Sequence, residues 1–523
     1  MKSFIKKYHH SIIGAINGFD RLLFRGTIRR IASVCGIVSY MQYHKILCKD
    51  FATWSTEITN RIRSASEQVA HNCQRPIHYI NRSSLDKEEY ARTIAKKDNI
   101  KEGLICLLSA VEPCMTFDLY KNREKKTLDV VARERKCLWL YHYMVHPVLG
   151  FMHARIQTWL PFTIKICING REWLSRQMDK ERIGYKRRGN CFVDIEDIHR
   201  AQEFLDTQLK TDWPALLNSI QETISPAYKT IFAHYPMPYY WSADESEWAS
   251  DIMFKSAAQL EKIYKQLLLH GITVFQSPDV MRFLGRLNEE RKGIHGNFKG
   301  QVVTSLKERP EGVRIKHWLN NNSVKIYNKE GSVLRAETTI NNASEFKVYR
   351  EAENKTGKPY EWQKMRKGVA DLHRRAHVSQ ACNNRYLDAL SIVETGEIVE
   401  KQLQPICQKV QYNGYGYRAL NPWSDHDAAL LKVICRGEFS INGFRNKNIV
   451  EHVYPDVVSQ KEYDRKRLSA KVGRDLRLLK AHGLIAKVAK THRYVLTKKG
   501  KTITTAFMIV NSSSINSLCQ IAA

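Results

Sequence analysis

The feature that most restricts the fold is a helix near the C-terminus with one apolar face and one strongly basic face. Between Asp464 and His482, apolar residues recur at helical spacing, and Gly483 follows where a left-handed residue commonly ends a helix. The apolar positions are Leu468, Val472, Leu476 and Leu479, and the basic positions are Arg467, Lys471, Arg474, Arg477 and Lys480. Such a helix can pack against its own domain with one face and present the other face to a partner.

The segments around this helix predict a small domain of helices followed by two strands. In chain order, they are helices at Asp425–Arg436 and Phe444–Tyr454, the basic helix itself, and strands at Leu484–Val488 and Tyr494–Thr497. Residues 464–501 contain thirteen Lys and Arg against two Asp, which gives a charge of +11. This order predicts a winged helix–turn–helix whose third helix enters a major groove, with Arg493 in the wing. A winged-helix adaptor that binds protein is the alternative.

The end of the basic helix and the strands after it resemble a known family. Leu-Leu-Lys-Ala-His-Gly-Leu-Ile at 478–485 and Tyr-Val-Leu-Thr-Lys-Lys-Gly at 494–500 are similar to the recognition-helix end and wing of MarR- and ArsR-like bacterial DNA-binding domains. The resemblance implies nucleic-acid binding, with DNA favoured over RNA. It leaves a homodimer open, because winged-helix regulators often dimerise.

The charge of the whole chain also predicts a polyanionic partner. The chain has 83 Lys and Arg against 53 Asp and Glu, a formal charge of +30, while its 43% hydrophobic content is typical of a folded protein. Outside 464–501, the remaining +19 (30 minus 11) is spread over 485 residues (523 minus 38). A thin basic coat of this kind predicts a second, longer contact along a nucleic acid.

The chain is too long for one ordinary core, and its texture changes along the sequence. We predict an α+β fold with antiparallel sheets, helical N-terminal and middle regions, and a C-terminal winged helix–turn–helix. The predicted regions are a mostly helical basic region at 1–100, the strand-rich half of an α+β core at 101–194, a helical insertion at 195–299, a strand-rich then helical second half of the core at 300–407, a linker at 408–421 and the winged helix–turn–helix at 422–510.

Two adjacent strands are predicted in the second half of the core. Ser323–Tyr327 and Val333–Ile340 alternate with period two, which places Arg335, Glu337 and Thr339 on one polar face and apolar residues on a face that can be buried. An exposed Arg–Glu pair on an antiparallel sheet is the simplest interpretation, and it would contribute little stability.

The same two strands resemble a second family. Lys-Ile-Tyr-Asn-Lys at 325–329 and Leu-Arg-Ala-Glu at 334–337 look like the Tyr-Asp-Lys and Leu-Arg-x-Glu strands of rolling-circle replication initiators from phages and plasmids, with Asn328 where aspartate is usual. The resemblance implies a mobile-element endonuclease that nicks one DNA strand and uses Mg²⁺ or Mn²⁺ as cofactor. Glu337 would be a metal ligand or general base, and the tyrosine nucleophile would be Tyr349, Tyr327 or Tyr386.

Another polar strand face is predicted in the strand-rich first half of the core. As a strand, His153, Arg155, Gln157 and Trp159 share one face, which would look into a cleft or onto a ligand. Replication initiators often use two histidines separated by one residue as metal ligands; Arg155 takes the second place here, and His142 on the preceding strand is another candidate. A sheet histidine beside a phosphate-binding arginine is the alternative. The predicted metal ligands are His153 and Glu337, and the predicted nucleic-acid contacts in the core are Arg155 and Arg335.

Asp20 lies among basic residues, which favour its ionised form and suit either an internal Asp–Arg pair or a metal ligand. It belongs to the string Gly-Phe-Asp-Arg-Leu-Leu-Phe-Arg-Gly-Thr at 18–27. With Gln-Thr-Trp-Leu-Pro-Phe at 157–162 and Glu-Thr-Thr-Ile-Asn-Asn at 337–342, this string is similar to a family of uncharacterised bacterial proteins. That resemblance spans most of the chain and implies no activity.

Several other classes of protein are not supported by the sequence. It contains no glycine-rich phosphate loop, nucleophile elbow or His-Glu-x-x-His string, so no ATP, nicotinamide or serine-hydrolase site is predicted. It has no apolar run of about 18 residues and no Cys-x-x-Cys among its twelve cysteines, which predicts a cytoplasmic protein without a membrane partner. We therefore expect a nucleic-acid-binding protein whose core nicks DNA; the alternative is a non-catalytic DNA- or RNA-binding protein, such as a transcription regulator or a ribonucleoprotein component.

Overall fold

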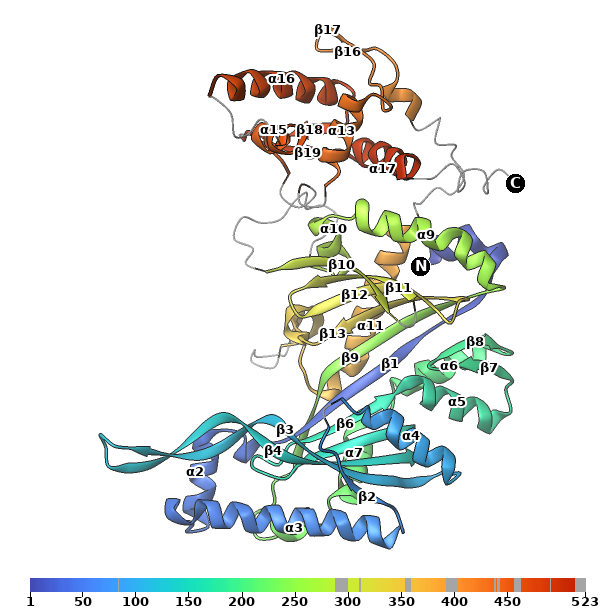
Figure 1. The fold of residues 1–523 in the computed structure, drawn as a ribbon. Coiled ribbons are helices and arrows are strands. Elements are labelled where there is room, and N and C mark those ends of the chain that lie inside the picture. The colour runs from blue at the N-terminus through green and yellow to red at the C-terminus, as the bar shows by residue number, and fades with distance from the viewer. Residues whose placement is uncertain are drawn as a thin grey trace. The chain divides into compact units, whose positions relative to one another are not determined.

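The chain folds into two compact units (Figure 1). The computed structural model describes residues 1–82, 84–286, 300–309, 312–352, 359–391, 403–436, 439, 443–455, 462–489 and 491–512. We call His9–Ala257 with Asn320–Asn384 the sheet unit, and Met1–Tyr8, Ala258–Leu319 and Arg385–Ala523 the terminal unit.

The sheet unit is organised around one large, mostly antiparallel sheet. Its strands lie in the order β12 (Asn322–Lys329), β13 (Val333–Ile340), β9 (Tyr239–Phe254), β1 (Ile12–Ile28), β6 (Ile164–Asn169), β5 (Gly150–Gln157), β4 (Thr127–His146), β3 (Gly103–Asn122) and β2 (Ile77–Tyr79). Neighbours pair antiparallel except β2 and β3, which are parallel. Because β1 and β9 pair along nearly their whole length, distant parts of the sequence meet within the sheet (Figure 1).

Helices and two hairpins pack on this sheet. The helices are α2 (Val34–Tyr43), α3 (Phe51–Asn72), α4 (Lys87–Lys97), α5 (Gly170–Glu181), α6 (Ile198–Gln208), α7 (Trp213–Ile224), α8 (Ala227–Ile231) and α11 (Leu372–Leu390), whose residues from Arg385 on belong to the terminal unit. The hairpins are β7 (Tyr185–Arg188) with β8 (Cys191–Ile195), and β14 (Lys347–Glu351) with β15 (Tyr360–Lys364). Helix α5 begins directly against β1, since a Cβ on Gly170 would lie 1.7 Å from the carbonyl oxygen of Phe19. That close approach brings the first turn of α5 onto the polar face of the sheet.

The terminal unit combines helices with short strands. Its elements are α1 (Lys2–Tyr8), α9 (Ala257–Thr273), α10 (Ser277–Phe283), β10 (Val302–Arg309), β11 (Gly312–Leu319), β16 (Val410–Tyr412), β17 (Tyr415–Tyr417), α13 (Asp425–Ile434), α15 (Asn446–Val453), α16 (Glu462–Ala481), β18 (Ile485–Lys487), β19 (Tyr494–Leu496) and α17 (Lys498–Ser512). One apolar cluster joins α13, α15, α16 and α17. It gives the C-terminal part a core of its own.

The α+β class and the large antiparallel sheet are confirmed, but three of its strands lie in regions predicted to be helical. These are β1 and β2 within 1–100 and β9 within 195–299. Residues on both faces of β9 are buried, including Ser246, Ser250 and Asp251, so the strand lacks the alternation of buried apolar and exposed polar residues that reveals a half-buried strand.

The predicted C-terminal helices and strands are all present. Their ends differ from the expected ones by no more than two residues, and Gly483 has the left-handed φ of +73° expected after α16. Val472, Leu476 and Leu479 of the predicted apolar stripe are buried, and Leu468 is half-buried. The stripe therefore packs into the C-terminal core as its spacing predicts.

Within the part of the chain that the structure describes, every helix is too short or too polar to traverse a lipid bilayer.

Candidate metal centre

A row of polar side chains, four of them charged, crosses one face of the sheet where β13 pairs with β9. Thr339 lies opposite Glu247 and Arg335 lies opposite Asp251, with Glu337 between them on β13. Residues directly opposite each other in an antiparallel pair point to the same face, and alternate residues along a strand do so too. All five side chains therefore point to one face.

The neighbouring strand β12 adds two residues to this face. Lys325 lies opposite Glu337, and Tyr327 lies opposite Arg335. The Lys325 ammonium is 2.6 Å from Oε1 of Glu337, and the Tyr327 hydroxyl donates a hydrogen bond of 2.9 Å to Oε2. Both carboxylate oxygens of Glu337 are thus engaged by these neighbours, and the residue is 1% exposed.

A β-bulge in β1 brings in a third carboxylate. Phe19 pairs with Trp248 and Arg21 pairs with Glu247, so Asp20 is an extra residue in the ladder between β1 and β9. A bulge redirects the side chain of its extra residue. Here it places the Asp20 carboxylate next to that of Glu247.

Asp20, Glu247 and Glu337 form a cluster that could hold a metal ion. Each offers one carboxylate oxygen, and these three oxygens all lie within 4.8 Å of one another. Asp20 is buried and the Glu247 side chain is 20% exposed, so the cluster is largely shielded from solvent. We call these three residues the acidic triad.

The triad changes the acidity of the groups around it. Burial and the adjacent Glu337 raise the pKa of Glu247 to about 8, against the opposing effect of Lys325. Burial alone would lower the pKa of the Lys325 ammonium, but Glu337 and Glu247 outweigh it and raise that pKa. Burial, reinforced by Glu337, raises the pKa of the Tyr327 phenol well above its usual value.

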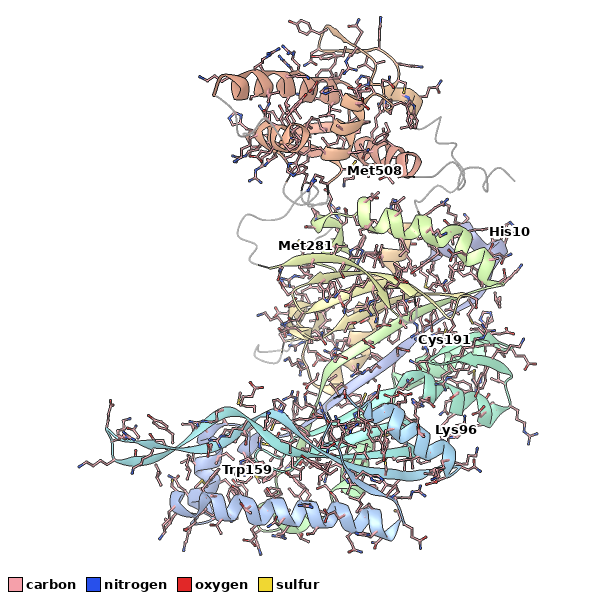
Figure 2. All side chains as sticks on the ribbon, viewed as in Figure 1. His10, Lys96, Trp159, Cys191, Met281 and Met508 are labelled. Atoms are coloured by element: carbon pink, nitrogen blue, oxygen red, sulfur yellow. The ribbon has the colours of Figure 1, made fainter. Side chains whose placement is uncertain are left out.

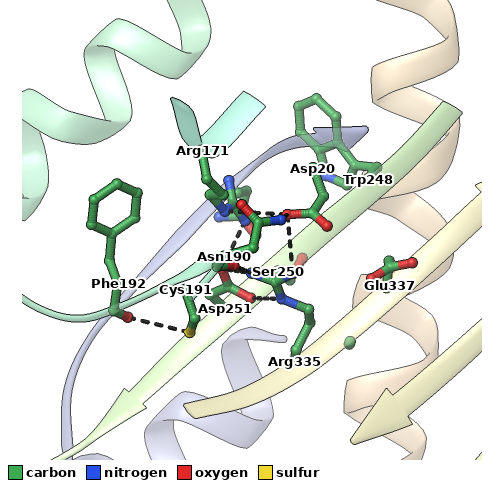
Figure 3. Close-up of polar contacts among 12 residues, drawn as sticks. Asp20, Arg171, Asn190, Cys191, Phe192, Trp248, Ser250, Asp251, Arg335 and Glu337 are labelled. Atoms are coloured by element: carbon green, nitrogen blue, oxygen red, sulfur yellow. Dashed lines mark hydrogen bonds and ion pairs between the residues drawn. The ribbon is translucent and has the colours of Figure 1, made fainter. Parts of the chain in front are cut away.

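A buried ion-pair network contacts the triad at Asp20 (Figure 3). Asp251 contacts Arg335 at 2.5 and 2.8 Å and Arg171 at 2.8 Å, and all three residues are fully buried. Burial alone would raise the pKa of Asp251, but the two guanidinium groups hold it below its ordinary value. Arg335 also reaches Asp20 at 3.0 Å, and the Asn190 amide donates to the same Asp20 oxygen at 2.9 Å. The network therefore fixes the position of the Asp20 carboxylate.

A cavity of about 530 Å³ opens beside the triad. Asp20 and Glu247 line it together with three arginines from β1, α4 and β7. Its lining residues are Asp20, Arg21, Glu88, Arg92, Phe151, Met152, His153, Cys167, Ile168, Asn169, Arg187, Gly189, Asn190 and Glu247. Figure 2 shows the side chains of the sheet unit and labels Cys191, which follows Asn190 at the start of β8. The cavity can therefore admit an anionic ligand that also binds a divalent cation.

The structure brings together only some of the predicted catalytic residues. Glu337 and Tyr327 are in contact, as described above. Tyr349 lies on the separate β14–β15 hairpin, is 56% exposed, and has no contact with Glu337 within the described residues. Tyr386 is fully buried and makes a hydrogen bond of 3.1 Å with His317 in the terminal unit.

The structure does not bring His153 and Glu337 together in one metal site, contrary to the prediction from the sequence. Among the described residues, Glu337 is grouped with Asp20 and Glu247, and His153 is outside that group. His153 lies in the cavity wall, where burial and then Arg155 lower its pKa to about 3. His142 cannot join it, because β4 pairs Tyr143 with His153 and so turns His142 to the other face.

The two arginines predicted to bind nucleic acid in the core are engaged inside the protein. Arg335 is fully buried in the ion-pair network, so the prediction that it lies on an exposed strand face is wrong. The whole of β13 is buried, on its polar face as well as its apolar face. The Arg155 guanidinium contacts Glu112 at 2.9 Å and the Tyr141 hydroxyl at 2.7 Å, so it bridges β5, β4 and β3.

The basic residues predicted on the C-terminal helix lie on its outer face. Among the described residues, none of the five on α16 forms an ion pair. Four of them are exposed: Arg467, Lys471, Arg474 and Arg477. Lys480 is half-buried, and so is Arg493, which directly precedes β19.

Sequence reasoning missed Glu247, Lys325, Arg171 and Asp251. Glu247 and Asp251 belong to Asp-Glu-Ser-Glu-Trp-Ala-Ser-Asp at 244–251, and this density of carboxylates was the available signal. Since β9 was expected to be helical, its residues could not be assigned to one face of a sheet. The bulge at Asp20 leaves no mark in the sequence at all.

Comparisons with protein-family models, with curated proteins and with solved structures found no match to this chain.

Proposed function

We propose that this protein is a divalent-metal-dependent enzyme that cleaves phosphodiester bonds in nucleic acid. The observation that carries the proposal is the acidic triad, whose oxygens lie within 4.8 Å of one another beside a cavity lined by arginines. Three carboxylates at such distances repel one another strongly in a shielded site. Lys325 contacts two of them, at 2.6 Å and 4.0 Å, and Arg335 contacts Asp20 at 3.0 Å. Because Arg335 is shared with Asp251, a further cation would stabilise the arrangement.

The donor atoms of the triad favour Mg²⁺ or Mn²⁺, because these ions prefer carboxylate and water oxygens. A further oxygen is available on the same face. Thr339 is 4% exposed and lies opposite Glu247, and its buried hydroxyl has no hydrogen-bond partner among the described residues. An orphaned buried hydroxyl here suits contact with an ion or its bound water. The proposed ligands are therefore Asp20, Glu247 and Glu337, in place of His153 with Glu337.

Residues around the triad have clear parts in such a reaction. A divalent ion held by the triad would polarise a phosphate oxygen and lower the pKa of a bound water. Lys325 and Tyr327 orient Glu337, while Arg21, whose side chain is half-exposed in the cavity wall, can bind phosphate oxygens.

Water is the proposed nucleophile, in place of a tyrosine. The phenol of Tyr327 is buried, its pKa is well above the usual range, and its hydroxyl is committed to Glu337. Tyr349 is exposed on another hairpin. Hydrolysis would leave no covalent protein–DNA intermediate, which distinguishes this proposal from tyrosine-dependent nicking.

We infer that the C-terminal elements are a winged helix–turn–helix that binds nucleic acid, with DNA favoured over RNA. The order α13, α15, α16, β18 and β19 supports it, as does the bridge between Phe444 and Tyr494. The exposed cations of α16 supply the electrostatic attraction.

The proposal is tested by incubating supercoiled and labelled single-stranded DNA with the full-length protein and Mg²⁺ or Mn²⁺. We expect cleavage that EDTA abolishes and that falls at least about 100-fold in Glu337→Gln and Asp20→Asn. The matched control is Asp244→Asn, on the same strand as Glu247 but paired with Arg25 at 2.6 Å outside the triad. Equal cleavage by all variants would exclude the triad.

A non-catalytic nucleic-acid-binding protein is the second candidate, favoured by the ion pairs that already balance part of the triad's charge. It predicts tight DNA binding with no metal-dependent cleavage by the wild-type protein.

A further inference from the structure

We propose that the β14–β15 hairpin is a stacking platform for the bases of single-stranded nucleic acid. The inference goes beyond the proposed cleavage reaction and uses none of the triad residues. It starts from three large aromatic side chains that the fold leaves in solvent. Tyr349, Tyr360 and Trp362 are 56%, 55% and 67% exposed.

The register of the hairpin places these rings together on one face. Tyr349 lies opposite Trp362, and Tyr360 lies two residues along β15 from Trp362. The centroid of the Tyr349 ring is 5.8 Å from that of Tyr360 and 5.9 Å from that of Trp362. The plane of the Tyr349 ring is tilted by 42° from that of Tyr360 and by 56° from that of Trp362, so Tyr349 does not stack face to face on either ring. Exposed aromatic faces at this spacing suit the stacking of successive bases.

The packing of the hairpin does not need these rings. Val348 points to the opposite face of β14 and is buried, as are Phe346 and Met365 at the base of the hairpin. The backbone N–H of Met365 donates to the carbonyl of Phe346 at 2.9 Å, which closes that base. An isolated two-stranded hairpin is only marginally stable, so the packing of these buried residues is what stabilises it. The aromatic face is therefore available to a partner.

The charge beside the rings identifies the partner as a polyanion. Lys347 and Lys364 are exposed and lie directly opposite each other on the aromatic face. Like charges directly opposite in a sheet repel, and a phosphate between them would relieve that repulsion. Residues 347–367 contain seven Lys and Arg against three Glu, which gives +4. The two lysines lie beside the Tyr349–Trp362 pair, while Glu351 lies opposite Tyr360 at the other end of the same face. A pair of rings with adjacent cations matches a base with its adjacent phosphate, whereas an apolar protein surface would gain nothing from the lysines.

The test is the binding of fluorescein-labelled oligothymidylate, followed by fluorescence anisotropy in EDTA. All proteins carry Arg474→Ala and Arg477→Ala, so that α16 contributes little. We expect Trp362→Ala and Tyr349→Ala each to weaken binding about tenfold, the loss expected for one stacked base. Trp362→Phe keeps a π-face and should stay within about threefold of the parent protein. Tyr120→Ala, which removes a 51% exposed ring on β3, is the matched control and should bind like the parent protein.

Two results would overturn the platform. Binding by Trp362→Ala and Tyr349→Ala equal to that of Tyr120→Ala would show that the rings do not contact the oligonucleotide. Equal binding by Trp362→Leu and Trp362→Phe would show an apolar contact without base stacking, as a protein partner would make. Since EDTA removes divalent ions, failure here and failure of the metal-dependent cleavage are separate results.

Discussion

Replacement of Asp251 by asparagine should strongly destabilise the sheet unit. The change keeps the size of the side chain and removes one negative charge. Asp251 is fully buried and accepts contacts of 2.5 and 2.8 Å from Arg335 and 2.8 Å from Arg171. Both guanidinium groups are themselves fully buried. Without Asp251, two buried cations would have to share the remaining carboxylate of Asp20.

The expected loss of unfolding free energy is about 3–5 kcal/mol, the usual cost of leaving a buried charge without its partner. Arg335 would keep Asp20 at 3.0 Å, but Arg171 would have only the 3.7 Å contact to the same carboxylate. Because one carboxylate cannot satisfy both cations, the loss should not fall to the level of an ordinary hydrogen bond, about 1 kcal/mol.

Urea unfolding followed by tryptophan fluorescence measures this loss. Eight of the ten tryptophans lie in the sheet unit, at positions 54, 139, 159, 173, 213, 241, 248 and 362, so the signal reports mainly on that unit. Glu67→Gln is the control, since it breaks the exposed Arg63–Glu67 pair on α3 and should cost about 0.5 kcal/mol or less. A loss below about 1 kcal/mol in Asp251→Asn would refute the reasoning that this carboxylate balances two buried cations.

Three further predictions follow from the same contacts. Glu247→Gln should stabilise the metal-free protein above pH 4.5, because a folded-state pKa near 8 makes ionisation of Glu247 costly. In urea titrations, the gain in unfolding free energy should be about 2 kcal/mol at pH 6, increase up to pH 8 and vanish below pH 4. Tyr327→Phe should retain cleavage measurable on a gel while losing about 1–3 kcal/mol of stability, since it leaves Glu337 with an unsatisfied oxygen; complete loss of cleavage in a folded variant would instead indicate a nucleophile. Arg474→Ala with Arg477→Ala should reduce the salt dependence of duplex DNA binding by about two in log–log slope, and an unchanged slope would place α16 away from the phosphates.

The C-terminal helices could be predicted because each buries only one face. The spacing of Val472, Leu476 and Leu479 survives in the sequence as a stripe, with arginines filling the opposite side. A glycine at 483 then marks the end of the helix. Local sequence and local packing agree there, which is the condition under which a pattern is informative.

The acidic triad could be predicted only in part, because it is made by pairing across long sequence distances. Glu337 was identified from its own strand, and Asp20 was recognised as a candidate ligand. Their meeting depends on β9, which lies between β1 and β13 and supplies Glu247. No local pattern reports the pairing of residues more than 200 positions apart, and the bulge that turns Asp20 inward is a property of the ladder.

Mn²⁺ binding to the purified full-length protein tests the central claim most directly. The electron paramagnetic resonance signal of free Mn²⁺ falls as the ion binds, which gives both affinity and stoichiometry without any need for a nucleic-acid substrate. One ion per chain is predicted to bind to the wild-type protein and to Asp244→Asn, with the affinity reduced at least about 100-fold in Asp20→Asn and Glu337→Gln. Equal Mn²⁺ binding by all four proteins, or no binding by the wild-type protein, would contradict the assignment of the acidic triad as a metal site.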